Sequence, residues 1–100
     1  GAGANLNIPL PAGTDDDAYL AALGRAADAI ASFGPSLLIV SLGVDTFHND
    51  PISDLAITTE GLRAQGELVA QLALPTVVLQ EGGYDVAAIG DNVSAFLLGF

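Results

Sequence analysis

One unbroken apolar run, Leu-Leu-Ile-Val at residues 37–40, constrains this chain more than any other feature. A strand with one exposed face alternates apolar and polar residues, whereas an unbroken run is typical of a strand covered on both faces. Strands of that kind belong to parallel sheets, in which helices cover the faces. A second short run, rich in β-branched residues, follows at residues 76–79. The two runs predict an α/β fold, a three-layer α/β/α arrangement around a parallel sheet.

Residues 5–36 contain the signals of a short strand and a first helix. Residues 5–10 are expected to form the strand, which prolines and a glycine then stop. Thr14 is the expected N-cap of the helix, and the three Asp residues at 15–17 place negative charge where the helix dipole favours it. The helix is expected to end at Gly34. Its apolar stripe consists of Tyr19, Leu20, Leu23, Ala27, Ile30 and Phe33.

Two further helices are expected, one between the apolar runs and one after the second run. The first of them begins at residues 58–60 and stops before Pro75. Asp85 is the expected cap of the last helix. The supporting apolar positions are Leu62, Val69, Leu72 and Ala73 in one helix, and Ile89, Val93, Phe96 and Phe100 in the other.

The order of these elements predicts the place of a site. Parallel strands joined by a helix present their carboxyl ends at one edge of the sheet, where open α/β folds bind ligands. Asp45 follows the first strand and Tyr84 the second, so that a carboxylate and a phenol can face one cavity. Gly43, Gly82 and Gly83 allow these loops to turn sharply or to approach a ligand. Spacing alone leaves open the alternative that Asp45 caps a loop and that Tyr84 is a half-buried packing residue.

Charge and composition exclude several classes of partner. The chain has 12 acidic residues against two Arg and no Lys, a net charge of −10. This balance lacks the basic surface that nucleic acids require and suits a cationic substrate, so we expect no nucleic-acid partner. With no Cys there is no thiolate metal site. Apolar runs fall far short of the ~20 residues of a membrane span and no signal peptide is visible, so we expect a cytoplasmic protein without a membrane partner.

The chain also has the composition of a piece of a larger domain. Apolar residues make up 51% of it and charged residues 14%, against a usual charged share of about 25%. On so short a chain, such a composition leaves apolar surface without polar cover. The chain begins at Gly1 and contains no Met. We therefore expect residues 1–100 to form part of one domain and to self-associate or pack on the missing portion.

Several short motifs, taken together and in order, resemble a known family. They are Ser-Leu-Gly-Val-Asp-Thr-Phe at residues 41–47, Asp-Pro at 50–51, Thr-Thr-Glu-Gly at 58–61 and Gln-Glu-Gly-Gly-Tyr at 80–84. The segment Asn-Leu-Asn-Ile-Pro-Leu at residues 5–10 fits the same pattern. The whole chain resembles the C-terminal portion of the histone deacetylase superfamily, and most of all its acetylpolyamine amidohydrolase branch.

The resemblance implies a zinc-dependent amide hydrolase with an arginase-deacetylase-like fold, acting on acetylated polyamines or acetyl-lysine. Asp45 matches the family's last zinc ligand, and Tyr84 matches its catalytic tyrosine, whose phenol would stabilise an oxyanion. Gly82 and Gly83 would give that tyrosine room to move onto the substrate. The other zinc ligands and the His-His pair that serves as general base are expected upstream of Gly1. We therefore expect residues 1–100 to be inactive alone.

Two alternatives stand beside this interpretation. One is a metal site formed within a single loop by Asp45, His48, Asp50 and Asp54, whose spacing lacks the regular acidic positions of a calcium loop. The other is a non-catalytic α/β module that packs on a partner through its apolar surplus.

Overall fold

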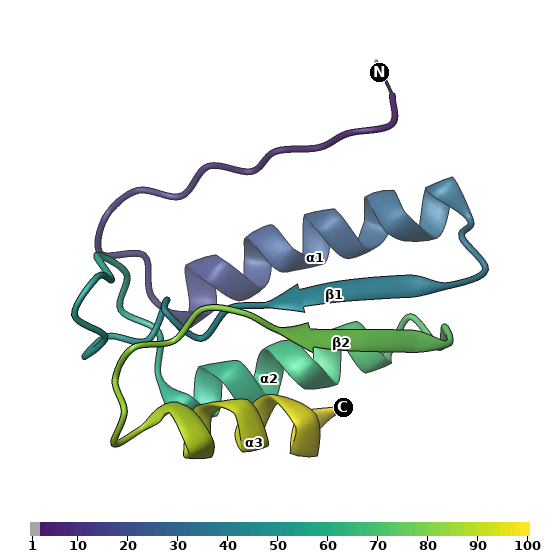
Figure 1. Ribbon diagram of the computed structural model, residues 1–100. Coiled ribbons are helices and arrows are strands. Elements are labelled where there is room, and N and C mark those ends of the chain that lie inside the picture. Colours follow the sequence, from purple (N-terminus) through teal and green to yellow (C-terminus); the bar gives the residue numbers. More distant parts are fainter. Residues whose placement is uncertain (1–2) are drawn as a thin grey trace.

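The computed structural model describes residues 3–100, in which helices and strands alternate (Figure 1). Their order is α1 (Asp16–Phe33), β1 (Leu38–Leu42), α2 (Thr59–Ala70), β2 (Thr76–Gln80) and α3 (Ile89–Gly99). In the described residues β1 and β2 form a two-stranded parallel sheet, with Leu38 opposite Thr76 and Leu42 opposite Gln80. The predicted α/β class and the parallel pairing are confirmed.

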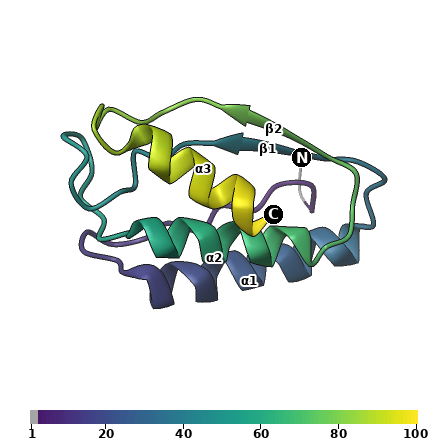
Figure 2. The same ribbon diagram turned by 90° about the horizontal axis from the view of Figure 1, so that it is seen from below.

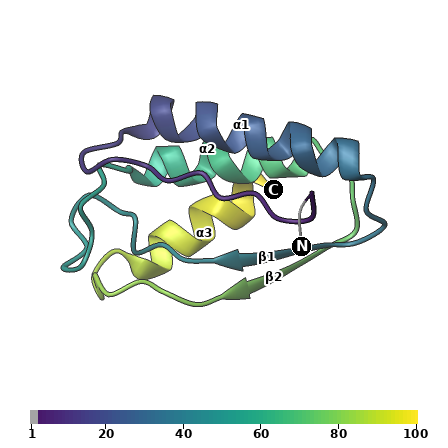
Figure 3. The ribbon, with the colours of Figure 1, turned by 90° about the horizontal axis from the view of Figure 1, so that it is seen from above.

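The helices of residues 3–100 all lie on one side of the sheet (Figures 2 and 3). Leu38, Val40 and Leu42 of β1 face these helices and pack into the core. On the other face, Ile39 is 61% exposed, and its register partner Val77 is 46% exposed. The expectation that both faces of the strands are covered is therefore not met within this part of the chain, which contributes helices to one face only.

The core lies between the inner face of the sheet and the helices α2 and α3. Its buried residues are Leu42, Val44, Ile57, Leu62, Val69 and Phe96. The two helices cross with their backbones in contact, because a Cβ atom on Gly66 would collide with the carbonyl oxygen of Phe96 and one on Gly99 with that of Arg63. Helix α2 follows the loop of Asp45, and α3 follows the loop of Tyr84.

The helix ends were partly predicted. Thr58 caps α2 by accepting a hydrogen bond from the Gly61 amide, and Gly34 ends α1 in the left-handed conformation, as expected. Thr14 is not the cap of α1: its hydroxyl donates to the Pro11 carbonyl, and the Asp15 side chain accepts from the Ala18 amide instead.

Three other predicted positions are wrong. Helix α2 ends at Ala70, so that Leu72 and Ala73 lie beyond it. The N-cap of α3 is Ala88, without a side-chain cap, because Asp85 caps the preceding turn through the Ala87 amide. Residues 5–10 are not a strand, since this segment, which contains Pro9, runs along α1 and not along a strand edge (Figure 3). Among residues 3–100, no helix combines the length and the apolarity that crossing a membrane demands.

Candidate functional site

The loops after β1 and β2 lie side by side at the carboxyl edge of the sheet (Figure 1). The Glu81 amide donates to the Leu42 carbonyl at 2.8 Å, and the Val44 amide donates to the Gly82 carbonyl at 2.9 Å. These two bonds continue the parallel pairing past the ends of the strands. The sheet edge thus brings the loops of Asp45 and Tyr84 together, as the order of elements predicts.

The carboxylate of Asp45 lies between two glycines, one from each loop. A Cβ atom on Gly43 would stand 2.7 Å from its Oδ1, and a Cβ atom on Gly82 would collide with its Oδ2. Any side chain at either position would push the carboxylate aside. Gly82 therefore makes room for Asp45, a role that its predicted place in a mobile substrate loop did not suggest.

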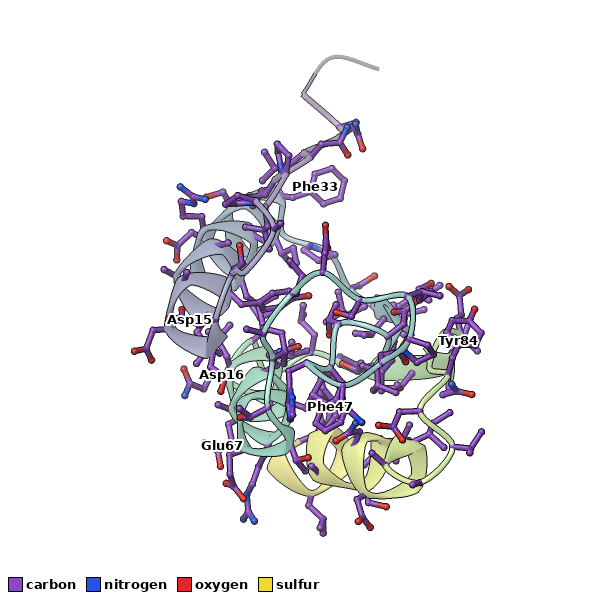
Figure 4. The ribbon with its side chains drawn as sticks, turned by 90° about the vertical axis from the view of Figure 1, so that its left-hand side faces the viewer. Asp15, Asp16, Phe33, Phe47, Glu67 and Tyr84 are labelled. Carbon is purple, nitrogen blue, oxygen red and sulfur yellow. The ribbon has the colours of Figure 1, made fainter. Side chains whose placement is uncertain are left out.

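Tyr84 stands at the outer rim of the site, on the side away from α1 (Figure 4). Its side chain is 53% exposed, so packing covers only about half of it. Gly83 precedes it with φ 147°, a conformation that L side chains rarely adopt, and a Cβ atom there would stand 2.6 Å from Val44 Cγ2. A larger residue at Gly83 would therefore strain the backbone that carries the tyrosine.

Asp50 accepts more hydrogen bonds than any other acidic side chain of the site, a role that was not predicted from the sequence. Its side chain is almost fully buried, at 5% exposure, and three backbone amides donate to it: Tyr84 at 2.7 Å, Ile52 at 3.1 Å and Asp85 at 3.3 Å. Burial alone would raise the pKa of Asp50, but these amides favour the ionised form and hold the pKa below its usual range. Asp50 is therefore a buried, ionised carboxylate whose oxygens are already engaged.

The alternative metal site within the first loop finds no support in this geometry. Among residues 3–100, no three His, Cys, Asp or Glu side chains come together where they could hold a metal ion. Asp50 binds backbone amides, and the exposed His48 lies tilted against the ring of Phe47, 4.4 Å between ring centroids. Of the acidic residues in this loop, Asp45 alone lies in a cradle of glycines from both loops.

Near the start of α1, Tyr19 lies within the electrostatic influence of Asp45, and Asp16 links α1 to α2, although the sequence predicted only helical positions for both. Burial raises the pKa of Tyr19, and the negative charge of Asp45 raises it further, so Tyr19 stays neutral at physiological pH with its phenol in the field of that carboxylate. Asp16 accepts hydrogen bonds from the amide and the hydroxyl of Thr58, and thereby ties the start of α1 to the start of α2 (Figure 4). Only the order of the helices and strands could have indicated these roles of Tyr19 and Asp16, because their residue types carry no such signal.

The described residues fit one ligand of a zinc ion and no more. A carboxylate oxygen is an ordinary zinc ligand, and the carboxylate of Asp45 lies where Gly43 and Gly82 leave room for it. A catalytic zinc site takes three protein ligands. The other ligands would have to come from outside residues 3–100.

Comparison with known proteins gives one consistent result. The profile of the histone deacetylase domain matches residues 1–100. The acetylpolyamine amidohydrolase of Burkholderia pseudomallei is 39% identical over 100 residues, which are the whole of this chain and 29% of that protein. Acetylpolyamine amidohydrolase 1 of Pseudomonas aeruginosa is 44% identical over the same share of each chain.

A solved structure agrees with these sequence matches. The crystal structure of an acetylpolyamine aminohydrolase from Burkholderia pseudomallei superposes with a TM-score of 0.92 at 38% identity, over 96% of this chain and 28% of that one. The predicted arginase-deacetylase-like fold is confirmed. The chain spans less than a third of the length of the relatives it matches.

Proposed function

Because the chain belongs to the histone deacetylase family, we propose that its protein hydrolyses the acetamide bond of small acetylated amines, with acetylated polyamines as the first candidates and acetyl-lysine as the second. The observation that carries this proposal is that the loop of Asp45 and the loop of Tyr84 lie at one edge of the sheet and are hydrogen-bonded to each other. Related proteins named acetylpolyamine amidohydrolases support the choice of polyamines.

Asp45 would hold a zinc ion with its carboxylate, together with ligands from outside residues 1–100. When bound, zinc polarises the acyl carbonyl and lowers the pKa of a water. Gly43 and Gly82 leave room for the carboxylate, because a Cβ atom at either position would collide with it. The nearby Tyr19 stays neutral and adds no second charge to the site.

Tyr84 would donate a hydrogen bond from its phenol to the acyl oxygen as negative charge develops there. A donor in this position is commonly worth ~10²–10³ in rate. The phenol stands at the rim with about half of its surface exposed, where it can reach a substrate that enters from outside. The His-His general-base pair is expected from the part of the protein outside residues 1–100.

The charge of the chain suits an amine substrate. Its net charge is −10, and three acidic residues lie in the loops around the site: Asp45, Glu81 and Asp85. Negative charge around a site raises the local concentration of cations such as acetylated polyamines and speeds their association.

The zinc assignment is tested by replacing Asp45 with Ala in the full-length protein. Loss of a charged ligand should lower both the zinc content of the purified enzyme and its turnover of an acetylated diamine. The matched control is Asp54→Ala, which removes an exposed carboxylate from the same loop. Full zinc content in Asp45→Ala would show that this residue caps a loop and holds no metal.

A further inference from the structure

Asp50 joins the loop after β1 to the backbone of the tyrosine loop. Its Oδ2 accepts a hydrogen bond from the Tyr84 amide at 2.7 Å and a second from the Asp85 amide at 3.3 Å. These partners are 34 and 35 residues away in the sequence. The carboxylate therefore connects two segments that no secondary-structure element joins at this point.

Asp50 is itself held firmly in place. Its other oxygen accepts from the Ile52 amide, its own amide donates to the Phe47 carbonyl, and its carbonyl accepts from the Ser53 amide. A buried carboxylate that accepts several N–H bonds is costly to disturb, because charge-assisted bonds are about twice as strong as neutral ones. Asp50 is thus a fixed point for whatever is attached to it.

A second bond from the adjacent residue reinforces this attachment. The side-chain amide of Asn49 donates to Oδ2 of Asp85 at 3.0 Å. Residues 49 and 50 together hold residues 84 and 85 by three hydrogen bonds, two to the backbone amides and one to the side chain of Asp85. We name this set of contacts the loop clamp.

The loop clamp holds the backbone of Tyr84 and does not touch its ring. The tyrosine side chain is 53% exposed, so packing alone does not set its position. Its own backbone amide is bonded to Asp50, and that amide lies next to the Cα from which the phenol extends. The direction of the phenol therefore depends on where the clamp holds the main chain.

We propose that Asp50 is a positioning residue that holds Tyr84 where its phenol can reach the acyl oxygen of the substrate. This inference rests on the proposed function, because it requires that Tyr84 act in the reaction. Asp50 contacts neither the substrate nor the metal in this scheme. It acts through the backbone of Tyr84.

The test is a double-mutant cycle in the full-length enzyme loaded with zinc. Asp50→Asn keeps the shape of the side chain but removes its charge and turns one of its oxygens into a donor. Because small misplacements of a reacting group are costly, it should lower kcat by roughly tenfold to hundredfold while KM and zinc content stay nearly unchanged. In a Tyr84→Phe background the same substitution should leave kcat unchanged, since no phenol remains to be positioned.

The outcomes separate this inference from the proposed function. If Tyr84→Phe lowers kcat but Asp50→Asn has no effect, or an equal effect in both backgrounds, Asp50 does not position the tyrosine and the deacetylase proposal stands. If Tyr84→Phe keeps full turnover, Tyr84 takes no part in the reaction and this inference fails, while hydrolysis of acetylated amines stands. If the parent enzyme hydrolyses no acetylated amine, the proposed function itself fails. Asp54→Asn is the control for loss of a carboxylate from the same loop and should leave kcat unchanged in either background.

Asn49→Ala provides a second variant if Asp50→Asn does not yield folded enzyme. It removes one bond of the clamp and leaves the buried carboxylate intact. A smaller loss of kcat that vanishes in the Tyr84→Phe background would support the clamp. A loss that persists there would contradict it.

Discussion

The α2–α3 crossing and the α1 side of the molecule are both built from small residues, yet they are packed in opposite ways. At the crossing, Gly66 and Gly99 allow two backbones to touch, and no space for a methyl group remains. Along α1, alanines and residues 3–6 instead line an open groove of about 450 Å³ that reaches the start of β1. Phe33, at the end of that groove, is 73% exposed (Figure 4).

The difference shows which half of the chain holds the site. The closely packed helices α2 and α3 come after the two site loops in the sequence, and backbone hydrogen bonds join those loops to each other. The open groove and the bare outer face of the sheet lie away from these loops and add nothing to that geometry. They are the surfaces that we propose pack on the rest of the protein.

The largest effect on stability is expected at the crossing. Gly66→Ala should place its methyl group against the Phe96 carbonyl, a backbone atom that cannot move aside. Overpacking of this kind costs about 1–3 kcal/mol of unfolding free energy. Thermal unfolding of the full-length protein measures it.

The matched control for this substitution is Gly24→Ala. Gly24 lies within α1, and nothing stands within 4 Å of a Cβ atom there. Alanine should therefore stabilise that helix by up to about 1 kcal/mol, because glycine is a poor helix former. If Gly24→Ala and Gly66→Ala changed the free energy of unfolding equally, the contrast between the α1 side and the α2–α3 crossing would be contradicted.

The second prediction concerns the outer face of the sheet in the isolated 100-residue chain. Ile39 and Val77 are register partners exposed on that face, and we expect the chain to self-associate through it. Val77→Lys should shift the chain toward smaller species in light scattering. Val86→Lys is the control, because Val86 is 89% exposed and lies off the sheet. An equal shift by both variants would point to charge alone as the cause.

The smallest expected effect is a dependence on pH. The pKa of Asp50 is lowered in the folded protein, so its stabilising contribution is complete above the unfolded value of about 3.9 and is lost as the pH falls through the folded value. Urea unfolding of the full-length protein from neutral to acidic pH should show this loss. Asp50→Asn should make the acid limb of the curve shallower, and an unchanged limb would mean that other carboxylates determine it.

Much of the fold could be predicted because its signals are local. Unbroken apolar runs, Thr58 as a cap and Gly34 as a stop each depend on neighbouring residues only. The cap of α1 was misassigned because four consecutive residues, 14–17, can all serve as caps, and only the bond of Thr14 to Pro11 decides among them.

The parts that could not be predicted depend on contacts between distant segments. From the sequence alone, a glycine within a helix is expected to destabilise that helix. Gly66 and Gly99 instead allow the backbones of α2 and α3 to approach each other closely. In the sequence, Asp50 is only one of several acidic residues in its loop. Its partners are backbone amides, which every residue except proline has, so no residue type indicates them. The loops that carry Asp45 and Tyr84 were correctly expected at one edge of the sheet, since parallel topology alone places the strand ends together. Their chemical roles stay predictions.

The most direct test of the account is the turnover of Tyr84→Phe in the full-length enzyme. The substitution keeps the ring and removes only the hydroxyl, so the fold and the zinc content should not change. If the phenol stabilises the oxyanion, kcat for an acetylated polyamine should fall by ~10²–10³ while the substrate still binds. A variant that keeps its zinc and turns over within about threefold of the parent would remove Tyr84 from the reaction and contradict the account.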